Sequence, residues 1–187
     1  MSHALLPVLE RNPVVASVKD VSLLPAALSS PCEVLFLLCG DVCSIGQLIG
    51  QIHSAGKFAV VHADLVQGLC QKDIVADYLL QCGADGIIST RPNLIRRGRE
   101  LSLLTVLRVF AIDSKAVSNL SREKNMALPD VIEVLPGIVP RVIGRISSSL
   151  HIPVIAGGLV EEKEDIVSAL SAGALCVSTT NAQLWDS

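Results

Sequence analysis

Two apolar runs near the end of the sequence stop at residues that could hold an anion. Gly157 and Gly158 follow residues 153–156, and Ser178 and Thr179 follow another apolar run about one strand–helix unit later. Glycine lets a ligand approach backbone N–H groups closely, and hydroxyls add donors. In a (β/α)8 barrel the loops after strands seven and eight usually hold a phosphate group. If six strands precede these residues, we expect the four of them to bind a small phosphate ester.

Polar and charged residues also stand at or near the ends of the other apolar runs. In a parallel barrel these ends meet at one mouth, where the chemistry of this fold takes place. The residues that we expect to contact a ligand or to line this mouth are Lys19, His62, Asp64, Ser89, Arg108, Asp113, Glu133 and Gly137.

Three of these side chains have more than one interpretation. Arg108 lies inside an apolar run, so its guanidinium needs either Glu133 on the next strand or a ligand phosphate as its ionic partner. His62 is either a core histidine bonded to a neighbouring strand or a ligand contact. Asp64, two residues further on, could hold a ligand hydroxyl or orient His62.

Eight short apolar runs, separated by helical stretches, would position these residues. The expected strands are residues 13–18, 33–38, 58–61, 86–88, 103–110, 131–135, 153–156 and 175–177. The expected helices are residues 21–28, 44–55, 73–82, 93–100 and 140–150, with a short last helix after the eighth strand. Runs that are apolar on both faces indicate a parallel sheet covered by helices. We therefore predict an α/β chain that forms one compact (β/α)8 TIM-type barrel domain over residues 1–187, with an open doubly wound sheet as the alternative.

Composition limits the classes of function. The chain has 187 residues, a formal net charge of −3 and 50% hydrophobic residues, which suits one sizeable core. No apolar run approaches the roughly 18 residues of a membrane helix, and the first residues lack a signal-peptide pattern, so we expect a cytoplasmic protein without membrane contact. The six cysteines form no Cys-x-x-Cys pair and lie mostly in apolar runs, which predicts buried free thiols and no metal site.

Six blocks that fall in order at the expected strand ends carry a family resemblance. They are residues 62–69, 85–90, 108–114, 129–137, 155–159 and 174–179. Together they resemble the glycerol uptake operon antiterminator regulatory proteins over nearly the whole chain. The resemblance implies a barrel that takes glycerol-3-phosphate as effector, uses no cofactor and is not an enzyme. It also implies binding to the leader mRNA of glycerol-utilisation genes, which prevents premature transcription termination.

The resemblance also implies where ligand and RNA contacts lie. It places ligand contacts in the neighbourhoods of His62, Ser89, Arg108, Asp113, Glu133, Gly157 and Ser178. After the fourth strand the family usually has a lysine-containing segment, whereas this chain has an arginine cluster there. Phosphate contacts of such a cluster give affinity without sequence readout, although a charged run is more often a solvated helix face. The RNA-binding candidates are Arg91, Arg96, Arg97 and Arg99.

Two other classes of protein remain open on the sequence. A small barrel enzyme acting on a triose or sugar phosphate could use His62, Asp64 and Glu133 as acid–base groups and Lys19 as a Schiff-base amine. A structural or protein-interaction module would keep the barrel without a working site. The sequence also leaves open whether the chain forms a homo-oligomer.

Overall fold

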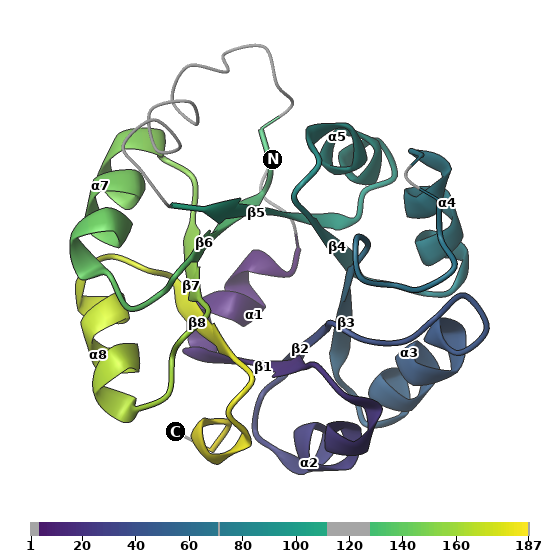
Figure 1. The fold of residues 1–187 in the computed structure, drawn as a ribbon, viewed down its shortest axis with the longest axis horizontal. Coiled ribbons are helices and arrows are strands. Elements are labelled where there is room, and N and C mark those ends of the chain that lie inside the picture. The colour runs from purple at the N-terminus through teal and green to yellow at the C-terminus, as the bar shows by residue number, and fades with distance from the viewer. Residues whose placement is uncertain (1–3, 71, 112–127, 187) are drawn as a thin grey trace.

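Eight parallel strands close into a barrel in the computed structural model, which describes residues 4–70, 72–111 and 128–186. Each strand pairs with the next along the chain, and β8 pairs with β1 (Figure 1). The strands are β1 (Val14–Val18), β2 (Val34–Leu37), β3 (Phe58–His62), β4 (Gly86–Ser89), β5 (Leu104–Phe110), β6 (Val131–Leu135), β7 (Val154–Gly157) and β8 (Cys176–Thr179). The predicted (β/α)8 barrel is confirmed, and the open sheet is excluded because the strand order closes on itself.

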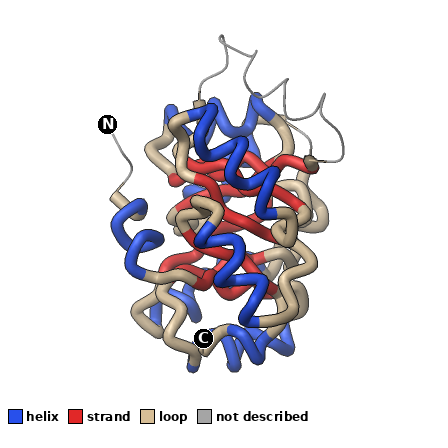
Figure 2. Tube along the Cα trace, turned by 90° about the vertical axis from the view of Figure 1, so that its left-hand side faces the viewer, coloured by secondary structure: helices blue, strands red, loops and turns tan. Residues whose placement is uncertain are grey.

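Helices cover the outside of the barrel, as Figure 2 shows. They are α2 (Leu24–Ser29), α3 (Ile45–Ser54), α4 (Ile74–Gln81), α5 (Pro92–Glu100), α7 (Pro140–Leu150) and α8 (Lys163–Ser171), with 3-10 turns η1 (Val21–Leu23) and η2 (Ala182–Leu184). The helix expected over residues 21–28 is split, and its α-helical part begins only at Leu24. A single helix would place the ring of Pro25 in its interior, where it clashes with the carbonyl of Val21.

A helix that we did not predict from the sequence, α1 (Leu6–Arg11), precedes the first strand. Leu5, Val8 and Leu9 are buried and belong to the same core cluster as barrel side chains such as Val15 and Phe36. Figure 1 shows α1 within the ring of strands. Because α1 ends at Arg11, just before β1 begins at Val14, it lies at the N-terminal ends of the strands and closes the end of the barrel opposite the mouth.

Alternate positions of each strand face two separate cores. One core packs between strands and outer helices, and the other fills the barrel with residues such as Val15, Val60 and Val106. Side chains two positions further along a strand return to the same face. At that next level the inward residues become polar, and they are Ser17, His62, Arg108, Glu133 and Ser178. The apolar interior therefore ends in a polar layer at the C-terminal mouth.

The cysteines are free, as predicted, but they are not all buried. Cys32 and Cys176 are buried, whereas Cys43 and Cys70 are exposed in connections near the mouth. Burial raises the pKa of the Cys176 thiol above its ordinary value. Across the described ranges no helix is long and apolar enough to cross a membrane, and no group of three or more His, Cys, Asp or Glu side chains is placed to hold a metal ion.

Candidate functional site at the barrel mouth

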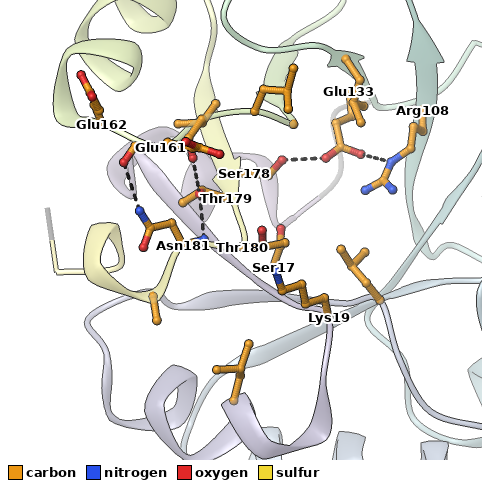
Figure 3. A pocket seen from close by; sticks show the side chains of 17 residues that line it. Ser17, Lys19, Arg108, Glu133, Glu161, Glu162, Ser178, Thr179, Thr180 and Asn181 are labelled. Atoms are coloured by element: carbon orange, nitrogen blue, oxygen red, sulfur yellow. Dashed lines mark hydrogen bonds and ion pairs between the residues drawn. The ribbon is translucent and has the colours of Figure 1, made fainter.

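A cavity of about 710 Å³ opens at the C-terminal ends of β1, β2 and β5 to β8 (Figure 3). Both polar and apolar side chains line it. The polar lining residues are Ser17, Lys19, Arg108, Glu133, Glu161, Glu162, Ser178, Thr179, Thr180 and Asn181. The remaining lining residues are Leu23, Leu38, Leu135, Gly158, Leu159, Val160 and Ala182. Its volume lies in the range of small-molecule sites.

A chain of three side chains crosses the floor of this cavity. Nε of Arg108 donates to Oε2 of Glu133 at 2.7 Å, and Oγ of Ser178 donates to Oε1 of Glu133 at 2.6 Å. The register of β5 and β6 sets Arg108 directly opposite Glu133. Their side chains are 10% and 1% exposed, so this is a buried ion pair. Glu133 is thus the ionic partner that Arg108 needs, and both carboxylate oxygens are used.

The outer end of the Arg108 guanidinium remains available for a ligand. Its Nη1 and Nη2 atoms make no hydrogen bond with any residue in the described ranges. Figure 3 shows these two nitrogens pointing away from Glu133, on the side of the cavity where Ser17 and Lys19 lie. Lys19 is exposed just beyond the end of β1. The cavity therefore has two cationic groups on its wall, one buried and one at the rim.

Two predicted glycines are required by close packing. A Cβ at Gly157 would overlap Oγ of Ser178 and lie 2.7 Å from Oε1 of Glu133. A Cβ at Gly137 would lie 2.7 Å from the backbone nitrogen of Gly157, and the Gly137 N–H donates to the carbonyl of Gly158 at 3.0 Å. Gly157 leaves room for the Glu133–Ser178 pair, and Gly137 brings the β6–α7 turn against the β7–α8 loop.

Thr179 holds the two loops of the cavity together. Its hydroxyl donates to the carbonyl of Val160 at 2.8 Å and accepts from the backbone N–H of Asn181 at 3.0 Å. Nδ2 of Asn181 adds a bond of 3.0 Å to the carbonyl of Glu161. Strand alternation turns Thr179 away from the interior that Ser178 faces. Its hydroxyl therefore fixes the shape of the cavity, with both its donor and an acceptor site in use.

Asp64 belongs to a separate cluster over the end of β4. Its carboxylate accepts from the backbone and hydroxyl of Thr90, from Oγ of Ser89 at 2.9 Å, and from Nε and Nη2 of Arg91 at 2.8 and 2.7 Å. Burial would raise the pKa of Asp64, but the hydrogen bonds from Thr90, Arg91 and Ser89 outweigh it and hold this pKa below its usual range. Neither His62 nor the cavity uses this carboxylate, so Asp64 and Ser89 fasten the β4–α5 turn.

His62 lies between the two clusters, at the end of β3. It is 3% exposed, and its pKa is lowered to about 4 by burial and by the charge of Arg108. The imidazole is therefore neutral at pH 7. Within the described ranges its buried Nδ1 has no hydrogen-bond partner, and the same holds for Nη1 of Arg91. The bond to a neighbouring strand that we considered for His62 is absent at this nitrogen.

The structure brings several predicted residues to one cavity and separates others. Lys19, Arg108, Glu133, Gly158, Ser178 and Thr179 line it, Gly137 and Gly157 support its wall, Asp64 and Ser89 form the separate cluster, and Asp113 lies outside the described residues. Ser17, Asn181 and Leu38 line the cavity and were not among the predicted site residues. Strand alternation could have found Ser17, because it follows the inward-facing Val15 by two positions.

The arginines predicted to bind RNA each have a partner within the protein. Arg91 binds Asp64, and the three arginines of α5 reach acidic or carbonyl groups beside them. These pairs are Arg96 with Asp73 at 3.6 Å, Arg97 with Asp77 and Glu100 at 2.5 and 2.8 Å, and Nη1 of Arg99 with the carbonyl of Leu128. The acidic residues of and beside α4 thus offset much of the positive charge that the sequence displays in this cluster.

Comparisons with known proteins agree with the barrel fold. The model of a family described as glycerol-3-phosphate responsive antiterminator matches residues 14–185. A protein of Escherichia coli K12 named uncharacterized protein YgcP is 39% identical over 182 residues, which are 97% of this chain and 95% of the relative.

Two solved structures are similar over nearly the whole chain. The glycerol uptake operon antiterminator regulatory protein of Listeria monocytogenes is 34% identical with a TM-score of 0.85, covering 92% of this chain and 94% of that one. A glycerol uptake operon antiterminator-related protein of Thermotoga maritima is 31% identical with a TM-score of 0.84, covering 94% and 99%.

Proposed function

The chain belongs to the glycerol-3-phosphate responsive antiterminator family, and on that premise we propose that it senses glycerol-3-phosphate in the mouth cavity and binds leader mRNA in response. The observation that carries the effector site is the half-used guanidinium of Arg108. It is held in place by Glu133 while its two Nη atoms have no partner in the described chain. A fixed guanidinium with free donors suits a phosphate oxygen.

The other residues of the cavity complement a phosphorylated polyol. Lys19 at the rim adds a second cation for the phosphate. Ser17 and Thr180 bring hydroxyl groups, and η2 begins beside them with Asn181 as its N-cap. Hydrogen bonds from these groups to the ligand's own hydroxyls would make the ester bind more tightly than free phosphate, because each such bond replaces one that the ligand hydroxyl makes to water. The ligand contacts that we predicted at Gly157 and Thr179 become supporting roles in this proposal.

We further propose that the chain binds its effector without converting it. The acid–base groups considered for an enzyme acting on a triose or sugar phosphate are His62, Asp64 and Glu133, and each would need a free and sufficiently basic atom near the substrate. Both carboxylate oxygens of Asp64 are taken up by the β4–α5 turn, and both of Glu133 by Arg108 and Ser178. The lowered pKa of His62 makes its imidazole a weak base at pH 7. These contacts favour a sensor over an enzyme.

Calorimetric titration with glycerol-3-phosphate, glycerol and inorganic phosphate tests the effector site. We expect the ester to bind more tightly than either fragment, with no change in the ester on prolonged incubation. Lys19→Gln should weaken binding about tenfold, the scale of one charge-assisted hydrogen bond. Lys163→Gln is the matched control, because Lys163 is exposed on α8 and does not line the cavity.

Other outcomes would assign the chain to another class. Turnover of the ester, or an imine trapped on Lys19 by borohydride, would make it an enzyme. Failure to bind any phosphate ester would favour the alternative of a structural or protein-interaction module. A substitution at Gly157 would not test the site, because any side chain there displaces the Glu133–Ser178 pair and so affects folding as well as binding.

A further inference from the structure

Helix α7 carries two arginines that form no ion pair with any residue that the structure describes. Residues 134–160 contain Arg141 and Arg145 and no Asp or Glu. Both arginines are exposed, and their spacing of four residues puts them on one face of α7. Neither side chain forms an ion pair or hydrogen bond with a residue that the structure describes. No described residue therefore competes with an external anion for their donors.

The contrast with α5 decides between the two basic helices. On α5 a phosphate would have to displace Asp77 from Arg97 and Asp73 from Arg96. It would also approach these carboxylates, which repel it. On α7 a phosphate meets two guanidiniums without displacing a partner, and no acidic residue occupies the first turn. α5 and α7 lie on different sides of the barrel (Figure 1). An RNA segment bound to one of these helices therefore need not contact the other, and variants of the two helices can be tested separately.

The turn before α7 touches the wall of the effector cavity. Gly137, three residues before α7, donates its N–H to the carbonyl of Gly158, and Gly158 lines the cavity. A Cβ at Gly137 would meet the backbone of Gly157, so the two turns are in close contact. A shift of the β7–α8 loop on effector binding would therefore be transmitted directly to the start of α7.

We propose that the phosphate backbone of the leader RNA binds the exposed face of α7 through Arg141 and Arg145, and that α5 is not the RNA-binding helix. This inference rests on the proposed function, because that function supplies the RNA. It commits to a polyanion on grounds of charge complementarity, since the two guanidiniums are exposed on one helix face and form no ion pair in the described ranges.

Two charge-matched double variants test it. Arg141→Gln/Arg145→Gln removes two positive charges from α7, and Arg96→Gln/Arg99→Gln removes two from α5. Binding of a labelled leader transcript of the source organism's glycerol-utilisation operon, with a scrambled RNA of equal length, is followed by anisotropy between 50 and 200 mM salt. We expect the α7 variant to lose at least about tenfold in affinity and its slope of log K against log salt to fall by about two. The α5 variant should stay within about threefold of the unmodified protein.

The outcomes separate this inference from the proposed function. Calorimetry with glycerol-3-phosphate should give the same affinity for both variants, which also reports that they fold. RNA binding lost in the α5 variant, lost equally in both or retained in both would overturn the assignment to α7. Effector binding without any RNA binding by the unmodified protein would reject the RNA part of the proposed function and the α7 surface with it. If the α7 variant weakened binding to RNA polymerase and left RNA binding unchanged, the surface would bind a protein and the inference would be wrong.

Discussion

The Asp64 cluster and the Glu133 cluster are built from the same chemical groups at the same end of the barrel, yet they differ in where their remaining donors point. In each, a carboxylate accepts from an arginine Nε and a serine hydroxyl. Arg91 also gives Nη2 to Asp64, and backbone and hydroxyl bonds from Thr90 complete that cluster. Arg108 gives Glu133 only Nε and turns its Nη atoms to a cavity. Nη1 of Arg91 also has no partner in the described ranges, but it is buried and Arg91 does not line the cavity. A strand-end ion pair therefore indicates a ligand site only where the remaining donors face an open cavity.

Among the variants of the two clusters, we expect substitution of Arg108 to have the largest effect, on both stability and effector binding. In Arg108→Met, Glu133 would lie buried without its ionic partner, so the free energy of unfolding should fall by about 3 to 5 kcal/mol. Glycerol-3-phosphate binding should be lost at the same time. Urea unfolding and calorimetry measure the two effects.

A double variant separates stability from binding at this cluster. Arg108→Met/Glu133→Leu replaces the ion pair by apolar groups and should recover most of the unfolding free energy. It should still fail to bind the ester. Restored binding in this double variant would contradict the role given to Arg108.

His62 gives the next largest effect, through pH. Its folded pKa of about 4 lies below the unfolded value of about 6.5, so below pH 6.5 the unfolded chain takes up a proton that the folded chain refuses. Stability should therefore fall as pH drops from 6.5 to 4, by about 3 kcal/mol in total. His62→Leu should lack this loss when urea midpoints are compared over that window. Equal pH profiles for the two proteins would show that the pKa of His62 is the same in the folded and unfolded chains, which would contradict the lowered pKa.

A substitution of Asp64 tests whether its cluster stabilises the fold without contributing to effector binding. Asp64→Asn should cost about 2 to 3 kcal/mol of unfolding free energy, because Arg91 loses its ionic partner while three-quarters buried. Glycerol-3-phosphate affinity of the folded variant should stay within about twofold, since Asp64 does not line the cavity. A loss of effector affinity comparable to that of Arg108→Met would mean that the two clusters act as one site.

The same residue supplies a smaller, acid-dependent test. The folded pKa of Asp64 lies below its unfolded value, so its contribution to stability is fully present above about pH 4 and is lost as pH falls through the folded pKa. The difference in unfolding free energy between the unmodified protein and Asp64→Asn should therefore shrink below pH 4. A difference that stayed constant down to pH 2 would contradict the lowered pKa.

Most of the fold could be predicted because its signal is local. Each apolar run is long enough for one buried strand, and the glycines and polar residues at its end mark where it stops. α1 was missed although Leu5, Val8 and Leu9 have helical spacing, because a single turn and a half of helix gives a weak pattern. Its role depends on packing into the end of a closed barrel, which no local pattern encodes.

The sequence by itself determined that strand-end residues would gather at one mouth and that Arg108 would need a charged partner. Only the tertiary structure decided which donors remain free, because that depends on which neighbours reach each side chain across the barrel. Register paired Arg108 with Glu133, and packing of α4 against α5 neutralised the arginines that looked most basic. No acidic side chain in the described ranges forms an ion pair with Arg141 or Arg145. The sequence gives the charge of each side chain, but contacts between residues far apart along the chain decide whether that charge is available to a ligand.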